Sequence, residues 1–412
     1  MIENWGAYSV RIGINGRFLV AKKTGVQRAA YNLIKTLVSV DRENQYFLFT
    51  GKDEIGKKDW DYENVRVIGS FIETGKTFRN LVWEQISLPF FAKKYRVDLL
   101  HSPANMSPLF YWGKSIVHIH DVCFVVNPQW YSFSFRTWYN WVIPRLAKRA
   151  ARVITNSNNS RNDILQFCQL PVDKVSMVYW AVDDSFLGNN IPGNRDEKVE
   201  DYILYVGSLE PRKNIKSLIE AFQKLRKDHE NLRTKLVLIG GESPLFADLK
   251  LNISDFGDDI ILKGFVSDEE LKGYYRHAGL VAYPSLYEGF GLPPLEAMAS
   301  GAPVVTSMTS SLPEVVGDAA IKVNPLDVHM LAESMAKILS NDDFRQKLIQ
   351  KGYDQVKKFN WFRVARNILA IYYEVHHRRA NQSSMDRHVY IPYEFWERLV
   401  QMEKEKLESI EF

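Results

Sequence analysis

A chain of 412 residues is long enough for two ordinary domains or one very large one. Apolar residues make up 46% and charged residues 25%, as in typical globular proteins, and a net charge of +4 gives no reason to expect nucleic acid as a partner. With two cysteines outside any CxxC pattern, no signal-peptide pattern and no apolar run near the roughly 18 residues of a membrane span, we expect a reduced, cytosolic setting.

Strand-like and helix-like segments alternate through the first half of the chain. Strands are predicted at residues 10–14, 46–49, 65–68, 99–100, 116–119, 153–155 and 175–178. Helices are predicted at residues 26–37, 80–95, 133–149 and 160–167. This alternation favours a mostly parallel sheet covered by helices on both faces.

The alternation restarts after residues 188–201, a polar stretch with clustered Gly, Pro and Asn that is the best candidate for a linker. Strands are predicted at residues 202–206, 236–239, 260–262 and 281–283, and helices at 214–227, 268–277, 327–339, 343–357 and 361–376. Ser267 and Glu270 fit a capping box at the start of one helix. We therefore predict an α/β fold with two doubly wound domains, residues 1–190 and 198–360, which face each other across a ligand cleft.

A tail, residues 381–412, begins polar and becomes amphipathic over residues 393–407. Phe395, Leu399 and Met402 lie on one stripe of the expected helix. Packing against the rest of the protein is the favoured interpretation, and contact with a membrane or a partner is the alternative.

The most informative segment begins at Ser285, where two carboxylates, Glu288 and Glu296, bracket a turn rich in Gly and closed by Pro. We predict a short helix over residues 294–300, which places Glu296 in its first turn. Such a loop can bring backbone close to a ligand while two carboxylates accept hydrogen bonds from hydroxyl groups, as a sugar nucleotide requires. The alternative is an ordinary strand-to-helix turn, in which the helix dipole favours an early glutamate.

Arg212 and Lys213 lie in the turn after the first strand of the second domain, just before a helix. Two cations beside a helix N-terminus suit a phosphate group, whereas an exposed, solvated pair is the alternative. Gly25 precedes a helix in the first domain and could bring backbone N–H groups to a diphosphate from across the cleft. Neither GxGxxG nor GxxxxGK[ST] occurs near these sites, which argues against a nicotinamide or P-loop site.

Two histidines alternate at the end of a predicted strand, and His120 lies nearer its carboxyl end than His118. His120 is therefore the better functional candidate, with a packed core histidine as the alternative. Asp59 and Asp61 match a DxD metal pattern, but they lie away from any strand end, and we predict no metal site.

Basic and aromatic residues are mixed in residues 78–94 and 133–152. Helices of this composition can rest on an anionic membrane surface. Burial of the aromatic side chains in the protein core is the alternative.

Taken together and in this order, these segments resemble the retaining GT-B glycosyltransferases of glycosyltransferase family 4 up to about residue 380. The E-x7-E motif from Glu288 to Glu296 carries most of the resemblance, and the segments VGSLEPRKN and SSLPEVVGDAA add to it. The family implies transfer of a sugar from a nucleotide diphosphate donor with retained anomeric configuration and without a metal cofactor. It also implies that the helix at residues 361–380 crosses back to the first domain.

The resemblance further implies roles for individual residues. Arg212 and Lys213 would neutralise the leaving diphosphate, Glu288 would face the donor sugar, and Glu296 would bind the ribose hydroxyls. His120 would lie beside the reacting carbon. The remaining residues expected at the donor are Gly25, Gly207, Gly264, Phe265, Val266, Phe290, Gly291 and Leu292. The single glycine at Gly25 departs from the paired glycines that are frequent in the family.

Segments such as TGVQR and DLLHSPAN are similar to bacterial mannosyltransferases of polysaccharide assembly. We therefore expect GDP-mannose as donor, with UDP-sugars next, and a glycan or a lipid-linked acceptor at the inner face of the membrane. A sugar-nucleotide epimerase, a phosphorylase and a non-enzymatic sugar-nucleotide-binding module remain as alternatives.

Overall fold

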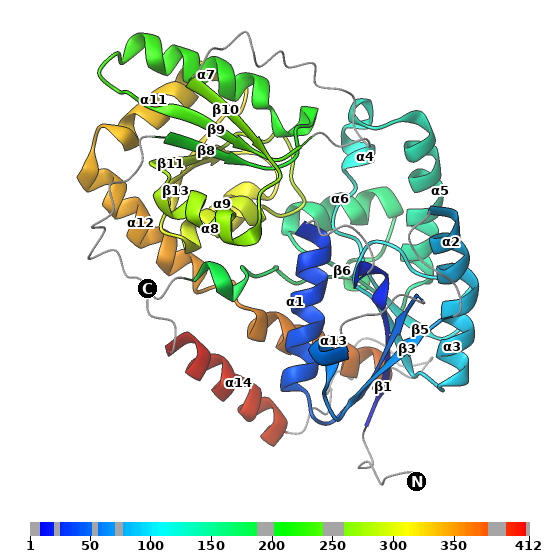
Figure 1. The fold of residues 1–412 in the computed structure, drawn as a ribbon. Helices are drawn as coiled ribbons and strands as arrows, with labels where there is room; N and C mark the ends of the chain where they lie inside the picture. The colour runs from blue at the N-terminus through cyan, green and yellow to red at the C-terminus, as the bar shows by residue number, and fades with distance from the viewer. Residues whose placement is uncertain are drawn as a thin grey trace.

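Two parallel sheets, each covered by helices, form the two halves of the molecule (Figure 1). The computed structural model describes residues 9–19, 25–51, 57–70, 77–187, 202–241, 259–377 and 393–408. The first sheet has seven strands in the order β3-β2-β1-β4-β5-β6-β7, and the second has six in the order β10-β9-β8-β11-β12-β13. This arrangement confirms the predicted α/β fold and is the GT-B architecture that the resemblance implies.

The first half alternates strands and helices much as the sequence predicts. Its strands are β1 (Arg11–Asn15), β2 (Gln45–Thr50), β3 (Val65–Gly69), β4 (Leu99–Ser102), β5 (Lys114–His118), β6 (Arg152–Thr155) and β7 (Val175–Met177). Its helices are α1 (Gly25–Val40), α2 (Thr77–Val82), α3 (Leu88–Lys94), α4 (Cys123–Val126), α5 (Phe133–Arg149) and α6 (Asn158–Cys168). The single helix predicted at residues 80–95 is divided by a π-helical turn, Trp83–Ser87.

The second half repeats this pattern. Its strands are β8 (Tyr202–Val206), β9 (Lys235–Ile239), β10 (Ile260–Gly264), β11 (Leu280–Tyr283), β12 (Val304–Ser307) and β13 (Ala320–Val323). Its helices are α7 (Ile215–Asp228), α8 (Asp268–His277), α9 (Leu292–Ala299), α10 (Leu312–Val316), α11 (Val328–Leu339) and α12 (Asp342–Val356). The capping box of Ser267 and Glu270 is present at the start of α8. The predicted linker, residues 188–201, lies outside the described residues.

Helix α13 (Trp361–His377) crosses back and packs along α1 of the first half (Figure 1). Its buried face brings Tyr373 to Asn44, whose side-chain amide donates to the tyrosine hydroxyl at 3.1 Å. Lys114 donates to the carbonyl of His376 at 2.6 Å, close to the carboxyl end of the helix. Helix α13 therefore holds the second half against the first.

Helix α14 (Tyr393–Glu408), red in Figure 1, lies beside α13. The carboxylate of Glu403 pairs with Arg363 at 2.8 Å and with Arg366 at 2.7 Å, and Met402 packs against the hydrophobic core. These contacts agree with packing on the protein itself; the side chains of Phe395 and Leu399 lie outside the described residues. Among the helices that the structure describes, none is both long and apolar enough to cross a membrane.

Candidate active site

The carboxyl ends of the two sheets meet at Gly289, in the loop between β11 and α9. A Cβ atom placed on Gly289 would lie 2.8 Å from Oδ2 of Asp121 and 3.1 Å from the carbonyl oxygen of His120. The hydroxyl of Ser160, in the first half, donates to the Gly289 carbonyl at 3.2 Å. The loop that carries the E-x7-E motif therefore contacts the segment just after β5, which brings predicted site residues of the two halves together.

The predicted cation pair lies at the end of β8, in a short 3-10 turn (Pro211–Lys213). Asn214 follows in a left-handed conformation, with φ of 56°, and its side-chain amide donates to the carbonyls of Pro284 and Pro325 at 3.1 and 2.6 Å. These hydrogen bonds hold the cation turn against the loop after β11, through Pro284, and against the segment after β13, through Pro325, so the two motifs have a fixed relative position.

Both cations bind the same carboxylate, that of Glu288. Arg212 donates to Oε2 at 2.7 Å, while the ammonium of Lys213 lies 2.5 Å from Oε1 and 2.6 Å from the Tyr283 hydroxyl. Arg212 also pairs with Glu210 at 2.5 Å. Lys213 is buried, so the alternative of an exposed, solvated pair is wrong for this residue: the turn places its side chain inward, between Tyr283 and Glu288.

The electrostatics of this cluster favour the charged form of Glu288. Burial acts to raise the pKa of Glu288, but Arg212 and Lys213 outweigh it and lower the pKa to about 2. Burial and the neighbouring Arg212 lower the pKa of Lys213. Burial also acts against the charge of Arg212, yet Glu288 and Glu210 raise its pKa well above the ordinary value. The cluster is a set of charges held in place before any ligand arrives, as stabilisation of a departing anion requires.

Glu296 lies on α9, but not where the sequence predicts it. The helix begins at Leu292, two residues early, because Pro293 and Pro294 both fit the first turn, where backbone N–H groups have no helical partner. Glu296 consequently falls in the second turn, and its placement in the first turn is wrong. Its carboxylate is buried and accepts a hydrogen bond from Tyr275 at 3.1 Å.

The other oxygen of Glu296 pairs across the cleft with Arg28, on α1 of the first half, at 3.0 Å. Arg28 also lies 3.5 Å from Asp268, at the start of α8. Burial raises the pKa of Glu296, and Arg28 and the Tyr275 hydroxyl act in the opposite direction. Sequence reasoning missed Arg28, although its position one turn after Gly25, at the cleft end of α1, was a usable signal.

Several of the predicted glycines lie at the cleft ends of helices and strands. Gly25 is the first residue of α1, and a Cβ on it would lie 3.5 Å from Leu292, the first residue of α9. Gly207 directly follows β8; a Cβ on the neighbouring Gly240 would lie 1.9 Å from the Gly207 carbonyl oxygen, so only glycine fits at Gly240. Gly264 ends β10 with φ of 67°, in the left-handed region.

Phe265 and Phe290 have opposite environments. The Phe265 ring is 71% exposed and lies over Gly241, whereas the adjoining Val266 packs partly against the core. Phe290 is buried; its ring lies 5.9 Å from that of Trp180, and its carbonyl accepts a hydrogen bond from the Ser311 hydroxyl. Gly291, with φ of 134°, precedes α9 and permits the sharp entry into the helix.

His120 is buried, with its ring 4.6 Å from that of Trp180. Burial lowers its pKa to about 3, with a smaller opposing effect from the backbone at Pro103, so the imidazole is neutral near pH 7. The adjacent Asp121 accepts a hydrogen bond from the Cys123 amide at 3.0 Å, and burial raises its pKa against the influence of Arg212. Asp121 is a carboxylate at the site to which the sequence analysis assigned no role.

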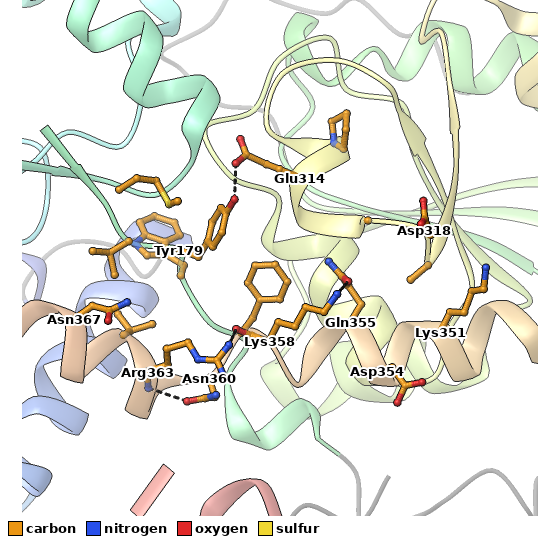
Figure 2. A pocket seen from close by; sticks show the side chains of 18 residues that line it. Tyr179, Glu314, Asp318, Lys351, Asp354, Gln355, Lys358, Asn360, Arg363 and Asn367 are labelled. Atoms are coloured by element: carbon orange, nitrogen blue, oxygen red, sulfur yellow. Dashed lines mark hydrogen bonds between the residues drawn. The ribbon is translucent and has the colours of Figure 1, made fainter. Parts of the chain in front are cut away.

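A cavity of about 790 Å³ lies elsewhere, where the chain passes between the two halves (Figure 2). Tyr179, Glu314, Gln355, Asn360 and Arg363 are among its lining residues, and none of the predicted site residues is. Within the described ranges, no three His, Cys, Asp or Glu side chains gather in a group that could hold a metal ion.

Comparison with known families places most of the chain in two matched regions. Residues 23–186 match the family described as Glycosyltransferase Family 4, and residues 189–355 match the family described as Glycosyl transferases group 1. The chain is 31% identical over 278 residues to an Escherichia coli O-antigen chain mannosyltransferase B, which covers 65% of this chain and 72% of the relative. It is 28% identical to the Escherichia coli serotype-specific mannosyltransferase WbdA over 89% of this chain, but spans only 45% of the length of WbdA.

Solved structures show the same fold at low sequence identity. A sucrose-phosphate synthase from Thermosynechococcus elongatus superposes with a TM-score of 0.68 at 21% identity and covers 89% of this chain and 99% of its own. HepE of Anabaena, solved in complex with UDP-glucose, gives a TM-score of 0.65 at 19% identity, covering 88% of this chain and 98% of its own.

Proposed function

The chain belongs to glycosyltransferase family 4, and from this premise we propose that it transfers mannose from GDP-mannose to a glycan or lipid-linked acceptor, with retained anomeric configuration and without a metal ion. Membership of the family makes the protein a nucleotide-sugar-dependent hexosyltransferase. The nature of the sugar, the base and the acceptor is the proposal, as are the roles of individual residues. The epimerase, the phosphorylase and the non-enzymatic module receive no support from the relatives.

The observation that carries the proposal is the cluster of the half-buried Arg212 with the buried Lys213 and Glu288. A nucleotide diphosphate gains negative charge as it leaves the sugar. Cations that are already in place stabilise that charge more in the transition state than in the ground state, and this difference accelerates the reaction. In our proposal Glu296 binds the ribose, and Gly25, Gly207 and Gly291 let backbone approach the donor.

The choice of mannose rests on the relatives, two of which are described as mannosyltransferases. HepE binds UDP-glucose on the same fold, and a UDP-sugar is therefore the second candidate donor. In either case, we propose that Gly264, Phe265 and Val266 border the base. The exposed Phe265 ring offers a flat apolar surface on which a purine could stack.

We propose that the acceptor attacks the face of the sugar from which the diphosphate leaves. Both oxygens of Glu288 are engaged by cations, which disfavours it as a nucleophile. The neutral imidazole of His120 would hydrogen-bond the sugar near its reacting carbon. Mass spectrometry after incubation with donor alone tests this, because a glycosyl adduct on Asp121 or Glu288 would instead establish a double displacement.

We also propose peripheral contact with an anionic membrane through the first half of the chain. Support comes from exposed aromatic side chains next to cations: Trp112 is 89% exposed and lies 4.8 Å from the Arg149 guanidinium, and Trp141 lies 4.4 Å from that of Arg145. Flotation with phosphatidylglycerol vesicles tests the contact. Replacing Trp112 and Trp141 by Ser should release the protein, whereas replacing Leu326 and Met330, exposed in the second half, should not.

We propose that residues 1–190 form the acceptor side, residues 198–360 bind the donor, and residues 381–412 form an extension. We propose a cytoplasmic location at the inner face of the membrane, because nucleotide sugars and lipid-linked acceptors meet there. Neither the division nor the location is needed for the enzymatic assignment.

The test of function is a binding screen followed by a transfer assay. Binding of GDP, UDP and ADP and their common sugars is measured by thermal shift with and without a chelator, and a selective rise with GDP-mannose that survives chelation is expected. Labelled GDP-mannose is then supplied with a membrane extract or a mannosylated glycan, and product NMR gives the anomeric configuration. Selective binding and transfer of a UDP-sugar would overturn the donor assignment, and an isomerised donor without acceptor would overturn transfer itself.

A further inference from the structure

Glu314, at the start of α10, reaches from the second half of the molecule into the first. Its Oε1 accepts a hydrogen bond from the backbone N–H of Asn159 at 3.1 Å. Its Oε2 accepts from the backbone N–H of Asn158 at 3.0 Å, from the side-chain amide of Asn158 at 3.0 Å and from the hydroxyl of Tyr179 at 2.8 Å. Every one of these donors belongs to the first half, and Figure 2 shows the bond from Tyr179 at the edge of the cavity.

The two backbone donors are the first N–H groups of α6, which have no partner within their own helix. Ser157 caps the next one, since its hydroxyl accepts from the N–H of Ser160 at 3.0 Å. A carboxylate in this position gains charge-assisted hydrogen bonds and a favourable interaction with the helix dipole. Glu314 therefore completes the N-terminus of a helix that belongs to the opposite half of the protein.

Helix α6 also contacts the loop between β11 and α9, which carries Glu288, at two further points. Ser160 donates to the carbonyl of Gly289 at 3.2 Å, and the hydroxyl of Tyr287 donates to Asp163 at 2.6 Å. Glu314 and Gly289 thus contact the first turn of α6, and Tyr287 contacts its second turn. Three contacts along one helix define an orientation between the halves, which a single contact cannot do.

We propose that Glu314 is a positioning residue, which clasps α6 and thereby aligns the loop around Glu288 with His120 across the cleft. This inference rests on the proposed function, because the donor site lies on the second half and His120 on the first. Displacement of reacting groups by about 1 Å can lower a rate by about a hundredfold. Asn158 is exposed, and Asn159, Tyr179 and Glu314 are partly exposed, so water can compete for these hydrogen bonds and the clasp is reversible.

Glu314→Gln tests the clasp, because the amide keeps the size of the side chain but loses its charge and presents an N–H group to N–H donors. We expect kcat to fall roughly tenfold or more while the dissociation constant for GDP, whose proposed binding residues lie mostly in the second half, changes less than about twofold. Tyr179→Phe removes one of the four hydrogen bonds and should have a smaller effect. Asp318→Asn is the matched control: Asp318 lies four residues further along and pairs with Lys322 in its own half.

Hydrogen exchange in the peptide that contains Asn158 and Asn159 reports the clasp directly and needs no turnover. Faster exchange in Glu314→Gln than in Asp318→Asn, with reduced kcat, supports the proposal. Unchanged kcat despite faster exchange would overturn it, and so would unchanged exchange. Equal losses in GDP affinity and kcat would also overturn it by placing Glu314 in the donor site. A wild-type protein that binds no nucleotide sugar refutes the proposed function instead, while the exchange result still decides whether the clasp exists.

Discussion

The guanidinium of Arg28, in the first half, lies 3.0 Å from the carboxylate of Glu296, in the second half. The carboxylate that we propose binds the donor ribose is therefore already paired with a cation from the opposite half. Tyr275 engages the other carboxylate oxygen at 3.1 Å. A carboxylate has about four lone-pair positions, so ribose hydroxyls can join these partners without displacing them. Arg28 would then remain as a cation beside the bound nucleotide.

Glu296→Gln should weaken nucleotide binding more than it affects folding. Hydrogen bonds to a charged group contribute about 1.5–3 kcal/mol each, which corresponds to roughly a 10- to 100-fold loss of affinity for one bond. Isothermal titration with GDP measures the change. Glu269→Gln, which replaces an exposed carboxylate on the nearby α8, is the control. An unchanged GDP affinity in Glu296→Gln would contradict the proposed contact with the ribose.

Arg28→Ala should make nucleotide binding sensitive to pH. Burial raises the pKa of Glu296, and Arg28 acts against this effect. Without Arg28 the pKa of Glu296 rises further, and protonation removes the charged acceptor as the pH falls. The affinity for GDP should therefore fall more steeply from pH 8 to pH 6 in Arg28→Ala than in the wild type or in Arg28→Lys. Parallel pH curves for the three proteins would contradict this account.

Gly289→Ala should impair turnover by forcing the two halves apart. The new Cβ would lie 3.1 Å from the backbone oxygen of His120 and 2.8 Å from the Asp121 carboxylate, and the backbone contact has little room to yield. We expect at least about a tenfold fall in kcat with GDP affinity retained. Gly273→Ala, in the open on α8, is the control and should stabilise the protein by about 0.5–1 kcal/mol. Equal activity of both variants would show that the contact at Gly289 is not needed.

Local patterns in the sequence predicted a large part of this structure. The apolar face of α7, from Ile215 to Leu225, follows from helical spacing, and its residues are buried as expected. The cation turn with Arg212 and Lys213 follows from its place at a strand end. Strands β12 and β13 were missed, although β11, which has the same length of four residues, was predicted.

Contacts between distant residues could not be predicted in the same way. Arg28 and Glu296 are 268 positions apart, and no local pattern indicates their pairing. The burial of Lys213 was missed for the same reason, since it depends on Tyr283 and Glu288 from a later loop. The orientation of the halves, which decides what faces His120, arises only when both sheets are folded.

The charge of Glu288 should make the protein sensitive to acid. Its pKa of about 2 in the folded protein lies below the ordinary value of 4.5, so the folded state binds this proton less readily than the unfolded chain. The resulting stabilisation is fully present above pH 4.5 and is lost as the pH falls towards 2. The difference in Tm between the wild type and Glu288→Gln should therefore be large at pH 7 and narrow below pH 4.5. A difference that stays constant from pH 7 to pH 3 would contradict the low pKa.

Lys213→Met should lower both stability and turnover, because Lys213 is buried against Glu288. Breaking a buried ion pair costs about 3–5 kcal/mol, and the cost should be smaller here because Arg212 still faces the carboxylate. Glu288→Gln should also destabilise the protein, because it leaves Arg212 and Lys213 without the negative charge of the Glu288 carboxylate. In the double variant, Lys213→Met with Glu288→Gln, each change removes the charge that the other leaves unpaired. Its loss in unfolding free energy should therefore be less than the sum of the losses in the two single variants.

Turnover in the same three variants separates the structural role of Lys213 from its proposed role at the diphosphate. If Lys213 only balanced Glu288, the double variant would regain activity together with stability. We expect stability to recover in part while kcat stays as low as in Lys213→Met, because no cation replaces the ammonium beside the leaving group. Chemical denaturation gives the free energies, and the transfer assay gives kcat. Recovered kcat in the double variant would assign Lys213 to the fold alone.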